Sequence, residues 1–410
     1  MSRPNAPVPG DSPPRATAKK KGGVTANKTF SLKDRLFNPI TVRLLADGLK
    51  RADATFDRRA FETEVLAQFP QLELKACIDC MADALVSYLP TDYAQATQVL
   101  HRALPQPLDP TLSDDDFGQF IWAVPSEFAA RKGCTGERIT LSLELLRETT
   151  KRFSAEFAIR PFLRDFPEET YAFLKDCAQD KNYHVRRLAS EGTRPNLPWG
   201  LAIDLPVDKT IAMLDLLHAD PTRFVTRSVA NNLNDISKTD PDVVLKALKR
   251  WAKLAQRQSP KNSQKNSQNG PKELDWLTKH ALRGLIKADH LEALTLLGYS
   301  TQPSFKLSKV SCADVIQVGD SLEWGAKLVS GKQQKLKIAL RVHFLKANGS
   351  YSSKVFSLKD TSAEKGQMLT LRKRIAFKAM TTRALYPGEH RVEVVVNGVA
   401  RGKRRFVLQG

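Results

Sequence analysis

Three acidic residues fall in stretches that otherwise have the apolar pattern of buried helices. They are Glu156 in FSAEFAIRPFL, Glu191 in VRRLASEGTRPNLPW and Asp235 in SVANNLNDISK. An ionised carboxylate is rarely buried unless it is paired or hydrogen-bonded, because removing it from water is costly. We therefore expect each of these acids to have either a cationic partner or a chemical task.

Arginines and a tryptophan lie close to these acids in the sequence. Glu156 precedes Arg160 by four residues on a predicted helix that Pro161 cuts short, so a simple ion pair is one explanation for this acid. Trp199 ends the loop TRPNLPW, which two prolines make rigid. Such a loop would present the indole beside Glu191 in a binding or catalytic cleft, although simple packing is the alternative.

Other polar residues of this region have less specific patterns. Asn231, Asn232 and Asn234 are poor helix formers near a helix end, which favours a hydrogen-bonding role for their side chains. His184 lies at a predicted helix start, where we expect a capping or surface residue and not a catalytic base.

The same stretch contains an internal repeat with an offset of 40 residues. Three residues recur in register, namely Asp180, Val185 and Arg187 as Asp220, Val225 and Arg227. Three apolar positions upstream also recur, namely Phe173, Leu174 and Cys177 as Met213, Leu214 and Leu217. A period near 40 with two helices per unit is typical of HEAT-like solenoids.

Amphipathic helices are also predicted on both sides of the repeat. Over residues 74–85 apolar side chains recur at helical spacing, and Pro90 ends the run. Cys77 and Cys80 have metal or redox spacing but lie inside this helix, so we expect inert buried thiols. Further helices are expected at 39–52, 57–69, 91–103, 116–130 and 137–150, and the helical array should close near Tyr299.

From about residue 303 the pattern changes to strands. Runs such as LKIALRVHF and VEVVV alternate with period two, and turn signals separate them. YPGEH, from Tyr386 to His390, resembles the tyrosine corner of immunoglobulin-like domains. The predicted fold is therefore mainly α, a HEAT-like helical-repeat solenoid followed by a smaller all-β immunoglobulin-like sandwich.

The positive charge is concentrated at the two ends of the chain. Residues 1–35 contain eight Lys and Arg against two Asp, and residues 303–410 contain 21 Lys and Arg against seven Asp and Glu. Because the formal net charge is +20, the central body sums to zero. This distribution favours a polyanionic partner, most often nucleic acid, over charge that serves only solubility.

Three segments organise the predicted domains. Residues 1–30 are expected to be a disordered basic tail, in which Lys19, Lys20 and Lys21 either add loose phosphate contacts or are simply solvated. Residues 31–300 form the repeat domain with a flexible polar insertion at 257–271, and 303–410 form the basic sandwich. No apolar run reaches the roughly 18 residues of a membrane span, and no signal-peptide core begins the chain. We expect a cytoplasmic protein with free cysteines, associated with the nucleoid when bound to DNA.

At FSAEFAIRPFL, VRRLASEGTRPNLPW, SVANNLNDISK and ALRGLIKADHLEALTLLGY the sequence resembles the AlkC branch of the AlkC/AlkD DNA glycosylases. The resemblance extends over residues 36–300 and implies HEAT-like repeats that grip duplex DNA, with an immunoglobulin-like domain after them. It implies excision of cationic N3-alkylated bases, 3-methyladenine and 3-methylcytosine, without base flipping. By this resemblance Glu156, Glu191 and Asp235 are the catalytic acids, and Trp199 is the aromatic that lies against the DNA.

The chemistry of the residues agrees with that implication. An N3-alkylated base is cationic, so its glycosidic bond is weakened and positive charge develops on the sugar, where carboxylates stabilise it and orient water. We expect no cofactor and no metal ion, and a monomer acting on double-stranded DNA that contains alkylated bases. Beside Trp199, the expected DNA-binding residues are Arg160, Arg186, Arg187, Arg194, Arg227, Lys238, Arg372, Lys373, Arg374, Arg401, Lys403, Arg404 and Arg405.

Two alternatives remain open from the residues. A non-catalytic HEAT-repeat scaffold that binds nucleic acid or an acidic protein would need the arginines but not the acids. A metal-dependent nuclease would use the three acids as ligands, although they lack compact metal-ligand spacing.

Overall fold

The computed structural model describes residues 32–114, 116–258, 269–378 and 384–410. The predicted tail at 1–30 and residues 259–268 of the predicted insertion lie outside these ranges. The two ends of that insertion, 257–258 and 269–271, are helical. The described residues fall into two compact units, one within residues 1–235 and 267–277 and one within residues 236–266 and 278–410.

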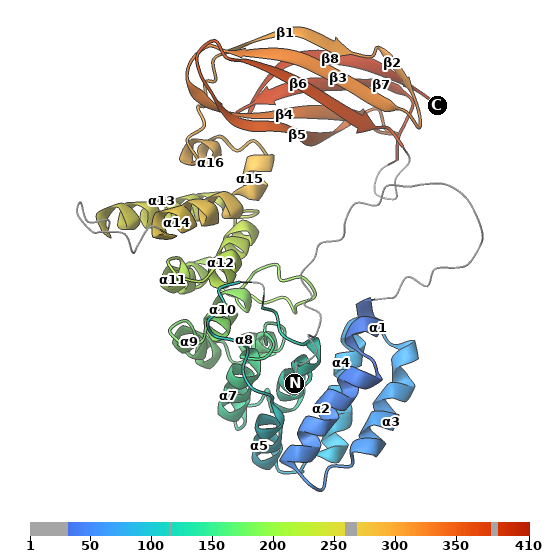
Figure 1. The fold of residues 1–410 in the computed structure, drawn as a ribbon, viewed down its shortest axis with the longest axis vertical. Helices are drawn as coiled ribbons and strands as arrows, with labels where there is room; N and C mark the ends of the chain where they lie inside the picture. The colour runs from blue at the N-terminus through green and yellow to red at the C-terminus, as the bar shows by residue number, and fades with distance from the viewer. Residues whose placement is uncertain (1–31, 115, 259–268, 379–383) are drawn as a thin grey trace, which may run out of the picture. The chain divides into compact units, whose positions relative to one another are not determined.

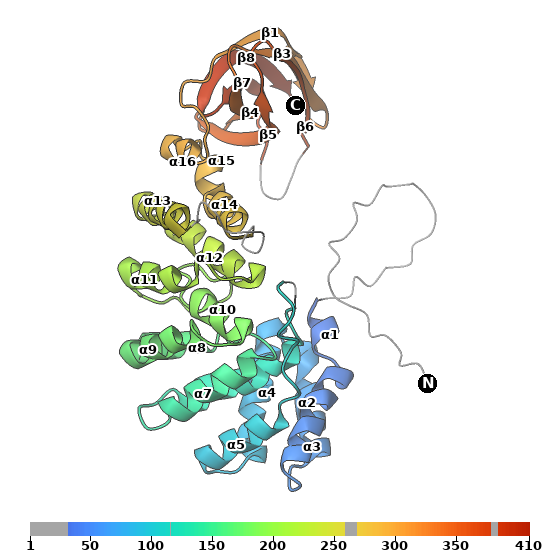
Figure 2. The same ribbon diagram turned by 60° about the vertical axis from the view of Figure 1, so that its left-hand side comes forward.

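The first unit is built from helices that stack in successive layers (Figures 1 and 2). In chain order they are α1 (Leu32–Leu36), α2 (Pro39–Ala52), α3 (Arg58–Gln68), the 3₁₀ helix η1 (Phe69–Gln71), α4 (Leu74–Tyr88), α5 (Tyr93–Ala103), η2 (Phe120–Trp122), α6 (Ala123–Gly133), α7 (Ile139–Thr150), α8 (Ile159–Asp165), α9 (Pro167–Cys177), α10 (Tyr183–Glu191), α11 (Val207–Leu217), α12 (Arg223–Ile236) and the beginning of α14 (Asn269–Ala281).

Local sequence signals account for the start of α2. The side chain of Asn38 accepts hydrogen bonds from the backbone N–H groups of Ile40 and Thr41, at 3.0 and 3.2 Å, and Thr41 Oγ1 accepts from the Asn38 N–H. This reciprocal capping satisfies N–H groups that have no partner within the helix. Pro39 occupies the first helical position, where its missing N–H costs nothing.

The 40-residue repeat is visible in the helices. The pairs α9 with α10 and α11 with α12 begin 40 residues apart. At each turn an aspartate accepts the N–H of the residue two positions on, Asp180 from Asn182 at 2.8 Å and Asp220 from Thr222 at 2.9 Å. The repeated apolar positions are buried, except for the half-buried Phe173. The predicted helical-repeat architecture is therefore confirmed.

The second unit combines the last helices with a β-sandwich. Its helices are α13 (Pro241–Gln258), the end of α14 (Asn269–Ala281), α15 (Arg283–Lys287) and α16 (Leu291–Leu296). Its strands are β1 (Phe305–Cys312), β2 (Val315–Gln317), β3 (Ser321–Ser330), β4 (Gln334–Leu345), β5 (Tyr351–Ala363), β6 (Met368–Ala376), β7 (Gly388–Val396) and β8 (Val399–Gln409).

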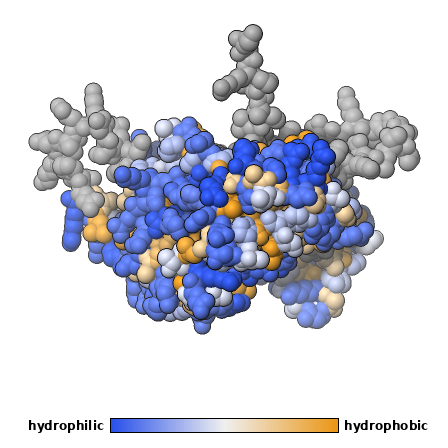
Figure 3. All heavy atoms as spheres, turned by 90° about the horizontal axis from the view of Figure 1, so that it is seen from below, coloured by the Kyte–Doolittle hydropathy of each residue, from blue (hydrophilic) through white to orange (hydrophobic). Residues whose placement is uncertain are grey.

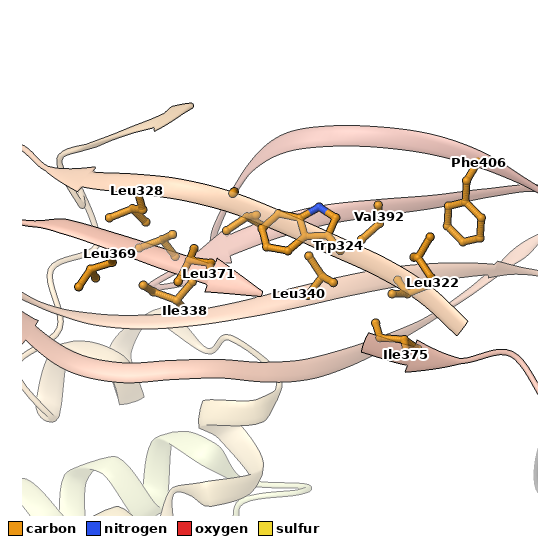
Figure 4. Packing of buried hydrophobic residues seen from close by; sticks show 14 of the residues in the cluster. Leu322, Trp324, Leu328, Ile338, Leu340, Leu369, Leu371, Ile375, Val392 and Phe406 are labelled. Atoms are coloured by element: carbon orange, nitrogen blue, oxygen red, sulfur yellow. The ribbon is translucent and has the colours of Figure 1, made fainter. Parts of the chain in front are cut away.

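These strands form two sheets, ordered β1-β3-β6 and β2-β8-β7-β4-β5, in which all pairs are antiparallel except β2 with β8. Apolar side chains from the inner faces of both sheets fill the space between them, as Figure 4 shows around Trp324. Their alternation with exposed residues is the period-two pattern of a sandwich. The predicted immunoglobulin-like sandwich is confirmed.

The corner before β7 is held by a histidine. His390 is fully buried, its Nδ1 accepts from the Leu345 N–H at 3.3 Å, and its Nε2 lies 3.0 Å from the Tyr386 carbonyl oxygen. The ring is therefore neutral with the proton on Nε2. Tyr386 itself is 37% exposed. The corner at the YPGEH motif is thus held by its histidine, and the likeness to a tyrosine corner stays a prediction.

Within the second unit, the helices are tied to the sandwich by polar contacts. Asp289, two residues after the end of α15, pairs with Lys337 at 2.9 Å and Arg341 at 2.7 Å. Tyr299 donates its hydroxyl to Asp360 at 2.7 Å. The close of the helical array and the sandwich are therefore parts of one compact unit.

The surface, the lengths of the apolar helices and the state of the cysteines complete the description of the fold. Figure 3 shows one face with predominantly hydrophilic residues and scattered hydrophobic ones. Among the described helices, none has both the length and the apolar character that a membrane span requires. All five cysteines are free, and burial raises the pKa of the Cys80 thiol to about 11, as expected for inert thiols.

Candidate active site

Glu156 lies in the turn before α8, not on a helix as predicted. Pro161 is the third residue of α8, so it belongs to the first turn of that helix and does not cut it short. Glu156 Oε2 is 2.9 Å from Arg187 Nη1, and the Glu156 side chain is 18% exposed. The predicted pair with Arg160 is therefore wrong, because the partner of Glu156 is an arginine from α10.

Glu191 is the last residue of α10, and two arginines hold it. Its Oε1 accepts from Arg194 Nη1 at 2.5 Å, and its Oε2 lies 3.4 Å from Arg187 Nη2. Arg194 also reaches Asp235, near the end of α12, at 2.9 Å. The three predicted acids therefore belong to one continuous chain of ion pairs, in the order Glu156, Arg187, Glu191, Arg194 and Asp235, which we call the acid–arginine ladder.

Two polar residues of α12 that are not among the predicted acids or arginines bind the buried end of α10 next to Glu191. Ser228 Oγ donates to Glu191 Oε2 at 2.6 Å, and Asn232 Nδ2 donates to the Ser190 carbonyl at 2.9 Å. Asn232 is fully buried, in agreement with its predicted hydrogen-bonding role. A signal for Ser228 was present, because the 40-residue offset aligns it with the core residue Leu188.

The electrostatics of the ladder favour the charged forms of Arg187, Glu191 and Arg194. Burial alone would raise the pKa of Glu191, but Arg187, Arg194 and Ser228 hold that pKa below its ordinary value. Burial likewise disfavours the charged guanidinium groups, yet the adjacent carboxylates raise the pKa of Arg187 and Arg194. The ladder is therefore a set of fixed charges, with three carboxylates against two guanidinium groups.

Arg160 does not have the DNA-binding position that the sequence suggested. It is 1% exposed and donates from Nη1 to the carbonyl oxygens of Gly192 and Arg194, each at 2.9 Å, and from Nε to that of Leu201. Burial first, and then the charge of Arg194, lowers its pKa to about 10, so it remains cationic at neutral pH. A side chain enclosed in this way cannot contact phosphate, and the prediction is corrected.

Trp199 lies in the loop between α10 and α11 and is 61% exposed. Its φ angle is 63°, in the left-handed region that a bulky residue rarely adopts. Lys75 Nζ donates to its carbonyl oxygen at 3.0 Å. A groove of about 540 Å³ is lined by Trp199 with Leu32, Lys33, Glu73, Leu74 and Lys75. The indole is therefore presented on the surface, so packing does not explain it.

The other predicted DNA-binding residues of the helices differ in exposure. Arg186 forms two bonds to Asp220, the shorter at 2.6 Å, and its side chain is 16% exposed. Arg227 pairs with Asp114 and is 31% exposed. Lys238, in the second unit, is exposed. Arg187 and Arg194 are committed to the ladder, with side chains 12% and 11% exposed.

On the sandwich, the strand period separates the basic residues 372–374. Arg372 and Arg374 are exposed on the outer face of β6, whereas Leu371 and Ile375 are buried on the inner face. Lys373 lies on the inner side and donates to the Ser357 carbonyl of β5 at 3.2 Å, so it closes the sandwich edge and is not part of an outer cluster. The β8 residues of the predicted set, Arg401, Lys403, Arg404 and Arg405, are exposed.

His184 is buried and not on the surface as predicted. Its exposed fraction is 5%, and its ring packs against Tyr183 and Phe224 with centroid distances of 4.1 and 5.4 Å. Burial, together with the charge of Arg187, lowers its pKa to about 4. The cap of α10 is instead Asn182, which accepts the His184 N–H.

No group of three or more His, Cys, Asp or Glu residues that could hold a metal ion occurs within the described ranges. Between the acids of the ladder lie guanidinium groups, which already occupy carboxylate oxygens. This arrangement gives the metal-dependent alternative no support from the donor set.

Comparisons with known proteins identify the family. Residues 150–266 match the family model described as DNA alkylation repair enzyme, and residues 306–410 match that of the C-terminal Ig-like domain of uncharacterised protein YhaZ. The chain is 32% identical over 378 residues to uncharacterized protein YhaZ of Bacillus subtilis, which covers 90% of this chain and 98% of that protein.

A solved structure provides the decisive likeness. The alkylpurine DNA glycosylase AlkC of Pseudomonas fluorescens, bound to DNA containing an abasic site analogue, is 31% identical and superposes with a TM-score of 0.76. The match covers 93% of this chain and all of that chain. The chain belongs to the AlkC-type DNA alkylation repair family. The resemblance inferred from the sequence motifs is therefore confirmed, as is the immunoglobulin-like domain that accompanies the repeats in this AlkC-type protein.

Proposed function

We propose that this AlkC-type protein is a monofunctional DNA glycosylase. It hydrolyses the N-glycosidic bond of cationic N3-alkylated bases, 3-methyladenine and 3-methylcytosine, in duplex DNA without flipping the base. The observation that carries the proposal is the acid–arginine ladder, because it joins all three predicted acids in one chain of contacts.

Glu156 is the proposed group that acts on the substrate. It is the most exposed acid of the ladder, and one arginine, Arg187, fixes its Oε2. A carboxylate held in this way presents negative charge toward the positive charge that develops on the deoxyribose as the bond breaks. It also orients the water that attacks the anomeric carbon, and the proton that this water loses passes to solvent. The leaving base departs neutral, because its positive charge is neutralised as it accepts the bonding electrons.

Glu191 and Asp235 have a different proposed part. Both are nearly buried, with side chains 4% exposed, and they neutralise and position Arg187 and Arg194. Arg187 in turn holds Glu156 Oε2 in place. Electrostatic preorganisation of this kind costs no reorganisation at the moment of reaction.

Duplex DNA is the proposed partner, and the charge of the chain supports it. The ladder carries one more negative than positive charge, which repels phosphate. Residues 303–410, the basic sandwich, contain 21 Lys and Arg but only seven Asp and Glu. Contacts of these basic residues with phosphate offset the repulsion.

The test is base release from alkylated duplex DNA by wild type and Glu156→Gln. The amide keeps the shape of Glu156 but removes its charge, so we expect the rate to fall by roughly 10²- to 10³-fold, the usual cost of losing one preorganised group. Affinity for duplex DNA should be unchanged or tighter, since a negative charge has been removed. Equal rates for the two proteins would refute the catalytic assignment.

A second candidate is a nucleic-acid-binding scaffold without chemistry. It is favoured by one observation, namely that each acid of the ladder already has an arginine partner. This candidate expects no base release from wild type. It also expects Arg372→Gln and Arg374→Gln to weaken DNA binding while Glu156→Gln leaves every property unchanged.

A further inference from the structure

We propose that Lys75 and Arg160 are positioning residues that fix the orientation of Trp199 relative to the acid–arginine ladder. The inference rests on the proposed function and on the expectation, implied by the family resemblance, that Trp199 lies against the DNA. Neither residue needs to touch the substrate for this role, because both act through the loop that carries the indole.

The conformation of Trp199 requires an external restraint. A φ of 63° is unfavourable by about 1 kcal/mol or more for a residue with a bulky side chain, and such strain persists only where the surroundings enforce it. The ring does not supply that restraint, because 61% of the residue is exposed. The backbone of the loop must therefore be held by its neighbours.

Arg160 holds the loop on both sides of Trp199. It donates to the carbonyl oxygens of Gly192 and Arg194 before the tryptophan and to that of Leu201 after it. One planar guanidinium group thus fixes three backbone positions, a geometry that the single ammonium group of lysine does not reproduce. The fit is close, because a Cβ on Gly200 would lie 3.1 Å from Arg160 Cδ.

Lys75 holds the tryptophan itself. It is the second residue of α4, 124 residues away in the chain, and its Nζ donates to the Trp199 carbonyl at 3.0 Å. The same Nζ lies 5.6 Å from the ring centroid of Phe157, which directly follows Glu156. Lys75 therefore connects the backbone of Trp199 to the segment that carries the most exposed acid.

These contacts connect the aromatic residue to the charged groups. Arg160 follows Glu156 by four residues, and its guanidinium group feels the charges of Glu156 and Glu191. A shift of the loop would move the indole relative to the acids. Misplacement by about 1 Å in an active site lowers rates by up to roughly 100-fold.

The primary test uses Lys75→Met in the full chain, with Lys33→Met as the matched control. Lys33 lines the same groove, but its Nζ donates to the Phe69 carbonyl at 2.9 Å and not to the loop. We expect Lys75→Met to lower single-turnover base release by roughly tenfold or more at saturating DNA, while affinity for undamaged duplex changes less than twofold. Lys33→Met should leave the rate near that of wild type.

Fluorescence provides a readout that does not depend on catalysis. Trp122, Trp251 and Trp324 are buried, Trp276 is half-buried beneath Arg223, and Trp199 is exposed. The contribution of Trp199 to acrylamide quenching is therefore the difference between a protein and its Trp199→Phe counterpart. We expect altered emission and quenching in Lys75→Met, with the change lost in the background variant Trp199→Phe. Unchanged emission and quenching in Lys75→Met would overturn the positioning role of Lys75, whether or not the wild type releases base. Absence of base release by the wild type would instead refute the proposed function.

Two further outcomes separate positioning from other roles. If Lys75 bound phosphate directly, Lys75→Met would weaken DNA affinity and reduce its salt dependence without lowering the saturated rate, which would overturn the proposal. Arg160→Lys keeps the buried charge but not the planar fork, so we expect intermediate loss of rate and the same fluorescence change. A fluorescence spectrum identical to wild type in a folded Arg160→Lys would also overturn it.

Discussion

Replacement of Glu191 by glutamine tests the physical basis of the acid–arginine ladder. Glu191 Oε1 accepts from Arg194, whereas Oε2 accepts from Ser228 and faces Arg187. In Glu191→Gln, the amide oxygen must take the Oε1 position, because an amide N–H there would face the N–H groups of Arg194. The amide nitrogen then donates to Ser228 Oγ and lies against Arg187.

The expected loss of stability follows from these contacts. Hydrogen bonds to a charged group contribute about 1.5–3 kcal/mol each, and the bond to Arg194 would lose roughly half of that when its acceptor becomes neutral. The attraction to Arg187 is lost altogether and replaced by a donor–donor contact. We expect the free energy of unfolding of the helical unit to fall by about 2–3 kcal/mol, somewhat less than for breaking a buried pair outright.

The assay is urea unfolding followed by circular dichroism at a helix-sensitive wavelength, which reports on the helices and little on the sandwich. Glu144→Gln is the control, because Glu144 also pairs with an arginine of its own helix, Arg147, but is 61% exposed. That pair should contribute less than about 0.5 kcal/mol. A loss of stability in Glu191→Gln no larger than in Glu144→Gln would refute the reasoning.

The pH dependence of the difference in stability between wild type and Glu191→Gln tests the sign of the effect. The folded-state pKa of Glu191 lies below its ordinary value of 4.5, so its stabilisation is fully present above that value and is lost as pH falls through the lower folded pKa. The difference between wild type and Glu191→Gln should therefore be constant near neutral pH and shrink below about pH 4.5. A difference that grows in acid would contradict the assignment.

Two other predictions concern a buried histidine and the basic sandwich. Burial lowers the pKa of His184 from 6.5 to about 4, so keeping this ring neutral costs nothing above pH 6.5 and up to about 3 kcal/mol of folding free energy by pH 4. In urea unfolding, His184→Leu should therefore lose less stability than wild type as pH falls through this range. His101→Gln, at an exposed site, should lose as much as wild type. Replacing both Arg372 and Arg374 by glutamine should reduce the slope of log affinity against log salt by up to about 2, measured by fluorescence anisotropy with duplex DNA, while Lys373→Gln should leave the slope unchanged because its Nζ is tied to Ser357.

The sandwich illustrates how far period-two reasoning extends. The alternation in β4 and β7 was readable from the sequence and correctly indicated a two-sheet core. The same alternation also places Lys373 on the opposite face of β6 from Arg372 and Arg374. The prediction of one basic cluster of these three residues ignored that alternation. The face of each residue was thus available from the sequence, but the acceptor of Lys373 on β5 was not, because strand order depends on tertiary pairing.

The sequence by itself determined the repeat and the acids. The offset of 40 residues between the helix pairs is a local periodic property, and three acids in apolar stretches are conspicuous because burial of charge is costly. Only the tertiary structure decided the partners. Arg187 and not Arg160 reaches Glu156, because the turn before α8 faces α10, and Lys75 reaches Trp199 across 124 residues. Side-chain pairing over such separations depends on the packing of helices, which no local pattern encodes.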